Sequence, residues 1–210
     1  MPEERNISPE TIKRLIIYLR CLESFKKKGI KIISSEDITA FINIQPSQFR
    51  KDLSFFGEFG KRGVGYNVDS LSDIIKKILG VDRKIDVALI GVGKLGSALI
   101  QYPGFKKINV DIVAFFDKNP RKIGKRVGNL KIKIEDISNA KSVIKRRGIK
   151  IALLCVPAEE AQPVADNIVE WGIKGILNFT PATLVLPRDI YVSSVDMASE
   201  LGNIIYYLKE

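Results

Sequence analysis

The sequence contains no histidine and only two cysteines among its 210 residues. Histidine is the usual general base near neutral pH and the commonest metal ligand, so its absence argues against catalysis and metal sites that depend on it. Cys21 and Cys155 each stand alone, without the paired spacing of a zinc site or of a disulfide framework. We therefore expect no bound metal.

Membrane segments and targeting signals are also missing. No window approaches 18 uninterrupted apolar residues, and the polar, acidic start lacks the basic-then-apolar order of a signal peptide. These absences predict a cytoplasmic protein with no membrane partner.

What the chain has in excess is positive charge, with 34 Lys and Arg against 24 Asp and Glu. Such a balance favours nucleic acid, an anionic membrane surface or phosphate-bearing ligands.

The first part of the chain carries the pattern of three helices. Apolar positions at 3.6-residue spacing predict an amphipathic helix over 9–28. A short second helix begins at Ser34 or Ser35, with Phe41 on its buried face, and a brief turn leads to a third helix over 46–56. Two helices joined by a short turn, the second of them polar and basic, predict a helix-turn-helix whose second helix enters a major groove.

The exposed face of the third helix carries side chains that can bond base edges or phosphates. These are Gln45, Ser47, Gln48, Arg50, Lys51 and Ser54. Beyond the helix, glycines surround Lys61 and Arg62, and the alternation of apolar residues predicts a β-hairpin over 57–68 with a basic tip. Beside a helix-turn-helix such a hairpin is a wing that reaches phosphates or a minor groove. A helix begun by Asp69 or Ser70 closes this part of the chain.

The second part predicts a parallel sheet with a dinucleotide site. The apolar run 85–90 is typical of a strand buried on both faces, and it leads into the GxGxxG motif of residues 91–96 and an apolar helix over 97–102. In such a motif the first glycine makes a tight turn, the second lets a pyrophosphate approach the backbone, and the third packs the helix on the strand. We therefore expect a Rossmann-type α/β domain.

An acidic residue at the end of the next strand supports this expectation. The strand 110–116 ends at Asp117, which lies 21 residues after Gly96, where an acid that binds a ribose 2′-hydroxyl is expected. A carboxylate there repels a 2′-phosphate and favours NAD(H) over NADP(H), although the adjacent Lys118 weakens that preference. The alternation continues with a helix at 138–147, a strand at 150–156, a helix at 159–172, and strands at 175–179 and 191–195.

Two further features belong to this part. Pro157 and Asn178 follow or end strands, at the edge where open α/β sheets bind ligands. Cys155 is interpreted as an inert core residue. The terminal helix, 198–208, has more apolar surface than a free tail requires, so we expect it to pack on another element or subunit.

The segments 50–66, 91–96 and 172–179 resemble the Rex family, the redox-sensing transcriptional repressors of bacteria. Shorter matches lie at 102–105, 116–117, 156–158 and 195–196. The resemblance implies an α/β protein with a winged helix-turn-helix domain over 1–80, a Rossmann NAD(H)-binding domain over 84–196, and a C-terminal helix, 197–210, exchanged within a homodimer. It implies a regulator and not an enzyme, one that binds inverted-repeat operator DNA and is released when NADH rises relative to NAD⁺.

The resemblance also implies roles for individual residues. Arg50, Lys51 and Ser54 would face the major groove, with Lys61 and Arg62 in the wing. The dinucleotide would lie against Gly91, Val92, Gly93, Lys94, Leu95, Gly96, Asp117, Lys118 and Val156, with Pro157, Asn178 and Phe179 nearer the nicotinamide. Arg20, Tyr102 and Asp196 would form a polar switch in which the aspartate changes partner with the cofactor state. Three residues depart from the family's commoner choices, namely Lys94 for Asn, Thr180 for Ala and Met197 for Phe.

Two other functions are compatible with the same motifs. An NAD-dependent oxidoreductase with an accessory N-terminal domain is the first, but a proton donor at a substrate is not evident and little chain is left for a substrate domain. The second is a winged-helix repressor whose Rossmann domain binds another nucleotide, such as CoA or ADP. Turnover of a substrate would establish the first, and a cofactor titration would separate the second.

Overall fold

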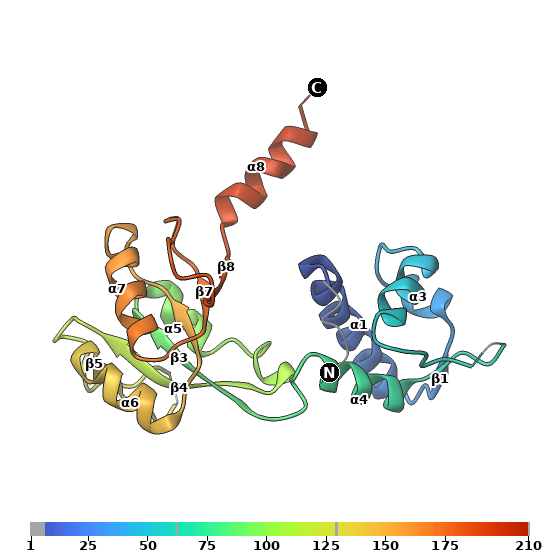
Figure 1. The fold of residues 1–210 in the computed structure, drawn as a ribbon, viewed down its shortest axis with the longest axis horizontal. Helices are drawn as coiled ribbons and strands as arrows, with labels where there is room; N and C mark the ends of the chain where they lie inside the picture. Colours follow the sequence, from blue (N-terminus) through green and yellow to red (C-terminus); the bar gives the residue numbers. More distant parts are fainter. Residues whose placement is uncertain (1–6, 62, 129, 210) are drawn as a thin grey trace. The chain divides into compact units, whose positions relative to one another are not determined.

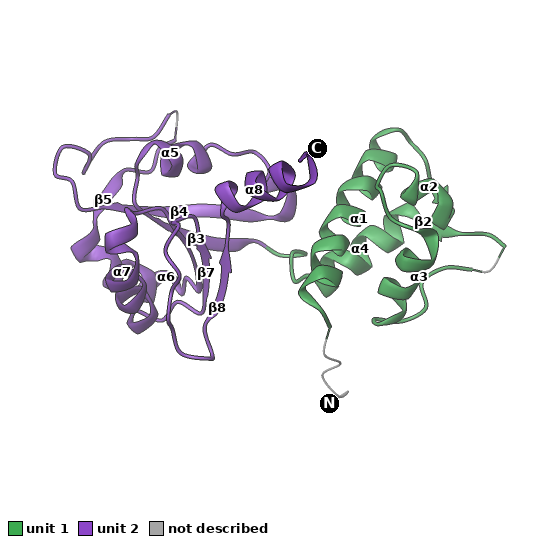
Figure 2. Ribbon diagram, turned by 90° about the horizontal axis from the view of Figure 1, so that it is seen from above, with its two compact units in different colours: residues 1–83 green, residues 84–210 purple. Residues whose placement is uncertain are grey.

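The computed structural model describes residues 7–61, 63–128 and 130–209. The chain divides into two compact units, residues 1–83 and residues 84–210, which we call the N-terminal unit and the C-terminal unit (Figure 2). Among the described residues no helix is both long and apolar enough to cross a membrane.

The N-terminal unit is a small helical domain with a two-stranded sheet. Its elements are α1 (Pro9–Lys27), β1 (Ile32–Ile33), α2 (Ser35–Thr39), α3 (Pro46–Ser54), β2 (Tyr66–Asn67) and α4 (Val68–Ile78). Its core holds the apolar faces of the helices. The ring of Phe49 packs edge to face against the rings of both Tyr18 and Tyr66. Such ring pairs add a modest stabilisation to the burial of their apolar area.

The predicted hairpin is present only at its tip. Lys61 and Gly65 pair through two backbone hydrogen bonds of 3.0 and 2.9 Å, but β2 pairs antiparallel with β1 and not with residues 57–60. Gly65 has a φ of 100°, and a Cβ atom there would collide with the carbonyl oxygen of Ile33. The close approach of β1 therefore requires glycine at this position.

Two local predictions in this unit were wrong. Phe41 is not in the core, because α2 ends at Thr39 and leaves Phe41 60% exposed in the following turn, edge-on to Phe25. The helix α4 begins earlier than expected, because the side chain of Asn67 caps it by accepting the backbone N–H of Ser70 at 3.0 Å.

The C-terminal unit is a six-stranded parallel sheet in the order β5-β4-β3-β6-β7-β8. Its strands are β3 (Ile85–Ile90), β4 (Val110–Asp117), β5 (Ile134–Asp136), β6 (Ile151–Leu154), β7 (Gly175–Asn178) and β8 (Tyr191–Ser194). Its helices are α5 (Lys94–Ile100), α6 (Ala140–Arg147), α7 (Ala158–Glu170) and α8 (Met197–Tyr207), with single 3₁₀ turns at η1 (Lys106–Ile108) and η2 (Ile137–Asn139). This arrangement confirms the predicted α/β fold.

Helices cover both faces of the sheet (Figure 1). Ala88 and Ile90 of β3 pack with α6 and α7, whereas Val87 and Leu89 of the same strand pack on the side of α5. Burial of alternate residues on opposite faces explains why the sequence of β3 is apolar almost throughout. The strand order reverses next to β3, so the carboxyl ends of β3 and β6 flank the crevice in which such sheets bind ligands.

The start of one helix and the presence of one strand in this unit differ from the sequence prediction. The helix after the glycine motif begins at Lys94 and not at residue 97, because Gly93 already serves as its N-cap in an extended conformation. The strand β5 was not predicted, since three residues are too few to show an alternation.

The terminal helix α8 extends away from the sheet (Figure 1). None of its residues is buried, and Leu201, Ile204 and Ile205 are each more than half exposed. The side chain of Asp196 caps it by accepting the backbone N–H groups of Ala198 and Ser199 at 3.0 and 3.3 Å.

Candidate functional site

A cavity of about 500 Å³ opens at the carboxyl edge of the parallel sheet. Of the residues predicted to hold a dinucleotide, it is lined by Gly91, Gly93, Lys94, Leu95, Asp117, Lys118, Val156, Pro157 and Phe179. Val92, Gly96 and Asn178 do not line it and are buried beneath the surrounding loops. The cavity therefore brings together the glycine motif, the end of β4 and the loop after β6.

The glycine motif is shaped to receive a phosphate. Gly91 has a φ of 94°, and a Cβ atom there would lie 2.5 Å from the carbonyl oxygen of Cys155. At Gly96 a Cβ atom would collide with the carbonyl oxygen of Gly91, so the helix α5 can approach β3 only with glycine. At Gly93, in contrast, no atom lies within 4 Å of the Cβ position. The first and third glycines are thus required by the fold, and the second leaves open space beside the backbone for a pyrophosphate.

Asp117 fixes the geometry of this loop. Its Oδ2 atom accepts the backbone N–H of Val92 at 2.9 Å and the Nζ of Lys122 at 2.9 Å, and its Oδ1 atom accepts the backbone N–H of Asn119 at 2.8 Å. Burial alone would raise the pKa of Asp117, but the bonds from Lys122, Asn119 and Val92 outweigh it and hold the pKa below its ordinary value. The carboxylate is therefore charged at neutral pH and joins β4 to the glycine motif.

Several residues of the cavity were not found from the sequence. Lys122 pairs with Asp117, and Glu160 accepts a bond of 2.6 Å from Lys118. Cys155 also lines the cavity, and its burial raises the pKa of the thiol to about 12. The order of the strands brings Glu160 to Lys118, and Lys122 reaches Asp117 across the loop after β4, so no motif in the sequence marks these side chains.

Asn178 and Thr180 organise the loop that follows β7. The Oδ1 atom of the fully buried Asn178 accepts both the backbone N–H and the hydroxyl of Thr180, at 2.9 and 2.8 Å, while its Nδ2 donates to the carbonyl oxygen of Ala182 at 2.9 Å. An alanine at position 180 could not donate the hydroxyl bond. The threonine thus adds a contact that holds the loop beside Phe179.

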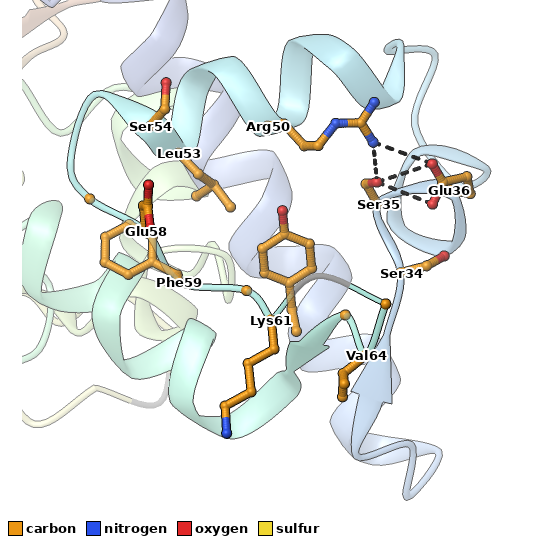
Figure 3. A pocket seen from close by; sticks show the side chains of 15 residues that line it. Ser34, Ser35, Glu36, Arg50, Leu53, Ser54, Glu58, Phe59, Lys61 and Val64 are labelled. Carbon is orange, nitrogen blue, oxygen red and sulfur yellow. Dashed lines mark hydrogen bonds and ion pairs between the residues drawn. The ribbon is translucent and has the colours of Figure 1, made fainter.

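A second cavity, of about 600 Å³, lies in the N-terminal unit between α2, α3 and the hairpin tip (Figure 3). Arg50, Ser54 and Lys61 line it, together with Glu36 and Glu58. Of the predicted DNA-contacting side chains, Gln45, Ser47, Arg50, Lys51, Ser54 and Lys61 are exposed, and Gln48 is half-buried. Arg62 lies outside the described residues.

A buried carboxylate anchors the exposed helix α3 to α1. Asp52 is completely buried and accepts bonds from the Nε and Nη2 of Arg14 at 2.6 and 2.7 Å, from the hydroxyl of Tyr18 at 2.7 Å, and from the Nε2 of Gln48 at 2.7 Å. Burial alone would raise the pKa of Asp52, but these bonds outweigh it and hold the pKa below its ordinary value. The amide nitrogen of Gln48 is therefore bonded to a buried carboxylate, whereas the sequence predicted that Gln48 faces DNA.

The predicted switch residues lie at the surface of their own units. Arg20 is exposed on α1 of the N-terminal unit, while Tyr102 and Asp196 are exposed in the C-terminal unit. Tyr102 stacks edge-on against Phe105, and Asp196 is engaged by the first turn of α8. In the described part of the chain, no group of three or more Cys, Asp or Glu side chains is arranged to hold a metal ion.

Two family models match the chain. One, described as the CoA binding domain, matches residues 82–182, and the other, described as the N-terminus of a putative DNA-binding protein, matches residues 6–54. The redox-sensing transcriptional repressor Rex of Chloroflexus aurantiacus is 42% identical over 207 residues, covering 98% of this chain and 97% of that protein. Its counterpart in Brevibacillus brevis is 41% identical over 208 residues, covering 99% and 100%.

Solved structures agree with these relatives. The structure of RSP in complex with β-NAD⁺ and operator DNA superposes with a TM-score of 0.90 at 36% identity, covering 98% of this chain and 94% of that one. The complex of RSP with β-NADH gives a TM-score of 0.85 at 35% identity, covering 98% and 95%. RSP is itself described as a Rex-family repressor. The curated relatives are thus named as regulators and not as enzymes.

Proposed function

The chain belongs to the Rex family of redox-sensing transcriptional repressors, and on this premise we propose that it represses transcription by binding inverted-repeat operator DNA and leaves that DNA when NADH binds. One observation carries the proposal. A polar, basic helix-turn-helix surface and a cavity built on a glycine motif occur in the two units of a single short chain. We also propose that this activity is cytoplasmic.

The DNA-binding surface is formed by α3 and the hairpin tip, within a DNA-binding domain over 1–80. The exposed Lys51 can reach base edges or phosphates, and Lys61 extends the positive charge beyond the helix. The hydroxyl of Ser54 donates to the carbonyl oxygen of Lys51 at 2.8 Å, and its oxygen can still accept a bond from the amino group of a base. Arg50 can form a bidentate contact with guanine, the commonest specific contact in a major groove. Gln45, Ser47 and Gln48 are assigned to the same surface, and Arg62, which lies outside the described residues, is assigned to DNA binding as well.

The dinucleotide occupies the cavity of the C-terminal unit, within a domain over 84–196. Its pyrophosphate lies on the open backbone at Gly93 and beside Lys94, and its ribose approaches Asp117. Val156, Pro157 and Phe179 provide an apolar lining nearer the nicotinamide. The oxidised ring carries a positive charge and the reduced ring does not, so an apolar lining disfavours NAD⁺ relative to NADH.

The active form is a homodimer held together by α8, residues 197–210 in our assignment. Its exposed Leu201, Ile204 and Ile205 give it a larger apolar surface than a free helix of a monomer carries. An exchange of this helix between two copies would bury these side chains and set the separation of the two recognition helices. Inverted-repeat operators match such a two-fold symmetric protein.

The coupling between the sites is a population shift. NADH can release DNA only by binding more tightly to the arrangement that does not fit the operator, and operator DNA then weakens NADH binding by the same factor. Arg20, Tyr102 and Asp196 are the polar residues that we assign to the change between the two arrangements. The carboxylate of Asp196 already bonds to α8, so it has a defined partner to give up.

The test is fluorescence anisotropy of a labelled inverted-repeat duplex, selected from a random pool with the wild-type chain, during titration with NADH, NAD⁺ or CoA. We expect NADH to release the duplex at concentrations where NAD⁺ does not. Release by CoA alone would support a sensor of another nucleotide, consistent with the description of one matching family model. Binding of NADH without binding of any duplex would refute the proposal that the chain is a DNA-binding repressor.

A matched pair of variants assigns the effect to the cavity. In Gly93→Val the added side chain enters the open space beside the backbone, so the variant should bind DNA but resist release by NADH. In Gly175→Ala the added methyl group meets only Ile151 at an ordinary 3.6 Å, outside the cavity, so release should be unchanged. Equal release from both variants would contradict the assigned site.

A further inference from the structure

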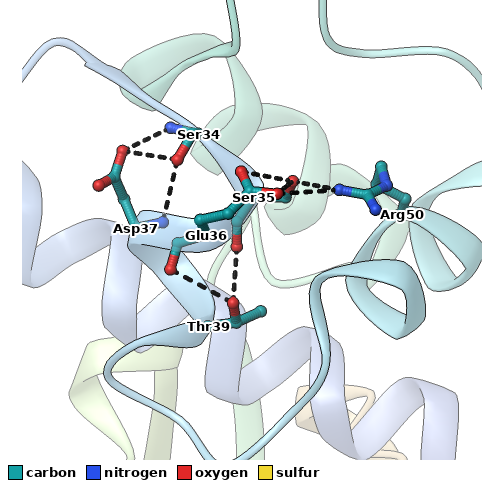
Figure 4. A network of polar contacts seen from close by, with 6 residues as sticks. All are labelled: Ser34, Ser35, Glu36, Asp37, Thr39 and Arg50. Carbon is teal, nitrogen blue, oxygen red and sulfur yellow. Dashed lines mark hydrogen bonds and ion pairs between the residues drawn. The ribbon is translucent and has the colours of Figure 1, made fainter.

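The guanidinium of Arg50 is not free at the DNA-binding surface. Its Nη1 donates to the hydroxyl oxygen of Ser35 (Figure 4). The same Nη1 also donates to the Oε1 atom of Glu36, at 3.3 Å. Both partners belong to the first turn of α2, which lies across the cavity from α3. The residue expected to read a base is therefore engaged by an acidic residue of the neighbouring helix.

The first turn of α2 is itself held rigidly. Ser34 and Asp37 form a capping box, in which Asp37 accepts the backbone N–H of Ser34 at 2.7 Å and the hydroxyl of Ser34 accepts the backbone N–H of Asp37 at 3.0 Å. The hydroxyl of Ser35 lies 3.1 Å from each carboxylate oxygen of Glu36. The backbone N–H of Glu36 and this hydroxyl lower the pKa of Glu36, so its carboxylate is charged at neutral pH.

We propose that Glu36 is a positioning residue that sets the sequence specificity of DNA binding through Arg50. This inference rests on the proposed function as a DNA-binding repressor. Glu36 keeps the guanidinium turned toward α2 until a matching base offers a better partner. While Glu36 holds the guanidinium, Arg50 is not available to phosphates, so binding that depends on phosphates alone is weakened.

The exposure of the pair allows such an exchange of partners. The side chains of Arg50 and Glu36 are 52% and 67% exposed, and ion pairs between exposed side chains contribute little to stability. A bidentate bond to guanine can therefore replace the contact with Glu36. At a duplex without the matching base nothing replaces it, so the guanidinium stays with Glu36 and adds no contact of its own to the phosphates. Discrimination then comes from a contact withheld at wrong sites as much as from one gained at the operator.

Glu58 provides a matched control. It lines the same cavity, but the Arg50 side chain points toward Ser35 and Glu36 and away from Glu58 (Figure 3). Replacing either glutamate by glutamine removes one negative charge from the same surface. Only Glu36→Gln removes the charged partner of Arg50, while Ser35 remains, so a difference between the two variants isolates the positioning effect from the change in net charge.

The experiment compares affinities of the full chain for two duplexes of equal composition, the inverted repeat selected by the wild type and a scrambled version. Glu36→Gln should bind the scrambled duplex about five-fold more tightly and lose a similar factor in its preference for the inverted repeat, as expected for one charge contact at a surface. Glu36→Asp, which keeps the charge, should retain the wild-type preference. An unchanged preference in Glu36→Gln, or an equal loss in Glu58→Gln, would overturn the proposal.

A second background shows whether the effect passes through Arg50. In Arg50→Ala the substitution Glu36→Gln should leave the preference between duplexes unchanged, because the residue that it positions is gone. A loss of preference as large as in the wild-type background would refute the role of Arg50. Failure of the wild-type chain to bind any duplex would instead refute the proposed function, so the two failures are distinguishable.

Discussion

The substitution Asp52→Asn should selectively destabilise the N-terminal unit. Asp52 is fully buried and accepts two bonds from Arg14, one from Tyr18 and one from Gln48. Asparagine keeps the shape but loses the charge and presents an amide group to a cation that remains largely buried. Removing one partner of a buried ion pair costs about 3–5 kcal/mol, and we expect the lower end, about 3 kcal/mol, because an acceptor oxygen remains.

Two spectroscopic signals together make this loss of stability measurable. Trp171 is the only tryptophan of the sequence and lies in the C-terminal unit, so its fluorescence follows that unit, whereas far-UV circular dichroism follows the helices of both. With a urea dependence of about 1 kcal/mol per molar for a small domain, the circular dichroism midpoint of the N-terminal unit should fall by about 3 M. The fluorescence midpoint should stay where it is.

The pH dependence gives a second, independent reading. The pKa of Asp52 is lower in the folded protein, so its stabilising contribution is present above the unfolded value of about 3.9 and disappears as the pH falls through the folded value. The difference in unfolding free energy between the wild type and Asp52→Asn should therefore narrow below about pH 4. A control substitution, Asp69→Asn, removes only an exposed ion pair with Lys26 and should leave both midpoints unchanged. Equal midpoints for Asp52→Asn and the wild type at pH 7 would refute the reasoning.

Three further results are expected. Ile204→Asp should convert a dimer into a monomer in light scattering, because it places a charge on the exposed apolar face of α8; an unchanged mass would contradict the role of that helix. Gly60→Ala should weaken DNA binding several-fold at unchanged NADH affinity, because its Cβ atom would lie 2.7 Å from the ring of Tyr66; equal affinity for DNA would show that the ring is not needed there. Cys155 should stay unlabelled by a thiol reagent at pH 8 until urea is added, because burial raises its pKa to about 12, and mass spectrometry of the native protein checks this.

The sequence predicted those parts of the fold that depend on local patterns. The spacing of apolar residues placed α1 and α3 within two residues of their observed ends, and the GxGxxG motif with Asp117 identified the edge of the sheet that carries the cavity. Both signals are short-range, since a helical face or a glycine turn is defined by residues that are neighbours in the chain.

Long-range pairings could not be predicted in the same way. The partner of β2 is β1 and not the adjacent arm of the hairpin, and Ile33 approaches Gly65 so closely that only glycine fits. Similarly, the contact of Arg50 with Glu36 joins residues on different helices, and neither residue is unusual in its own segment. Such contacts exist only after the elements have packed, so one sequence contains no local sign of them.

The cap at Asp196 sets the free energy that the proposed switch needs to move this carboxylate. Its carboxylate accepts the backbone N–H groups of Ala198 and Ser199 and the hydroxyl of Ser199 at 2.6 Å. A helix cap of this kind stabilises by about 1 kcal/mol, so a partner that recruits the carboxylate needs only a slightly larger advantage to uncap α8. An energy of that size corresponds to a change of about five-fold in an equilibrium constant. A carboxylate that can be released at so small a cost suits a sensor of the ratio of two metabolites. Such a sensor has to change its conformation when the ratio changes and regain its first conformation when the ratio is restored.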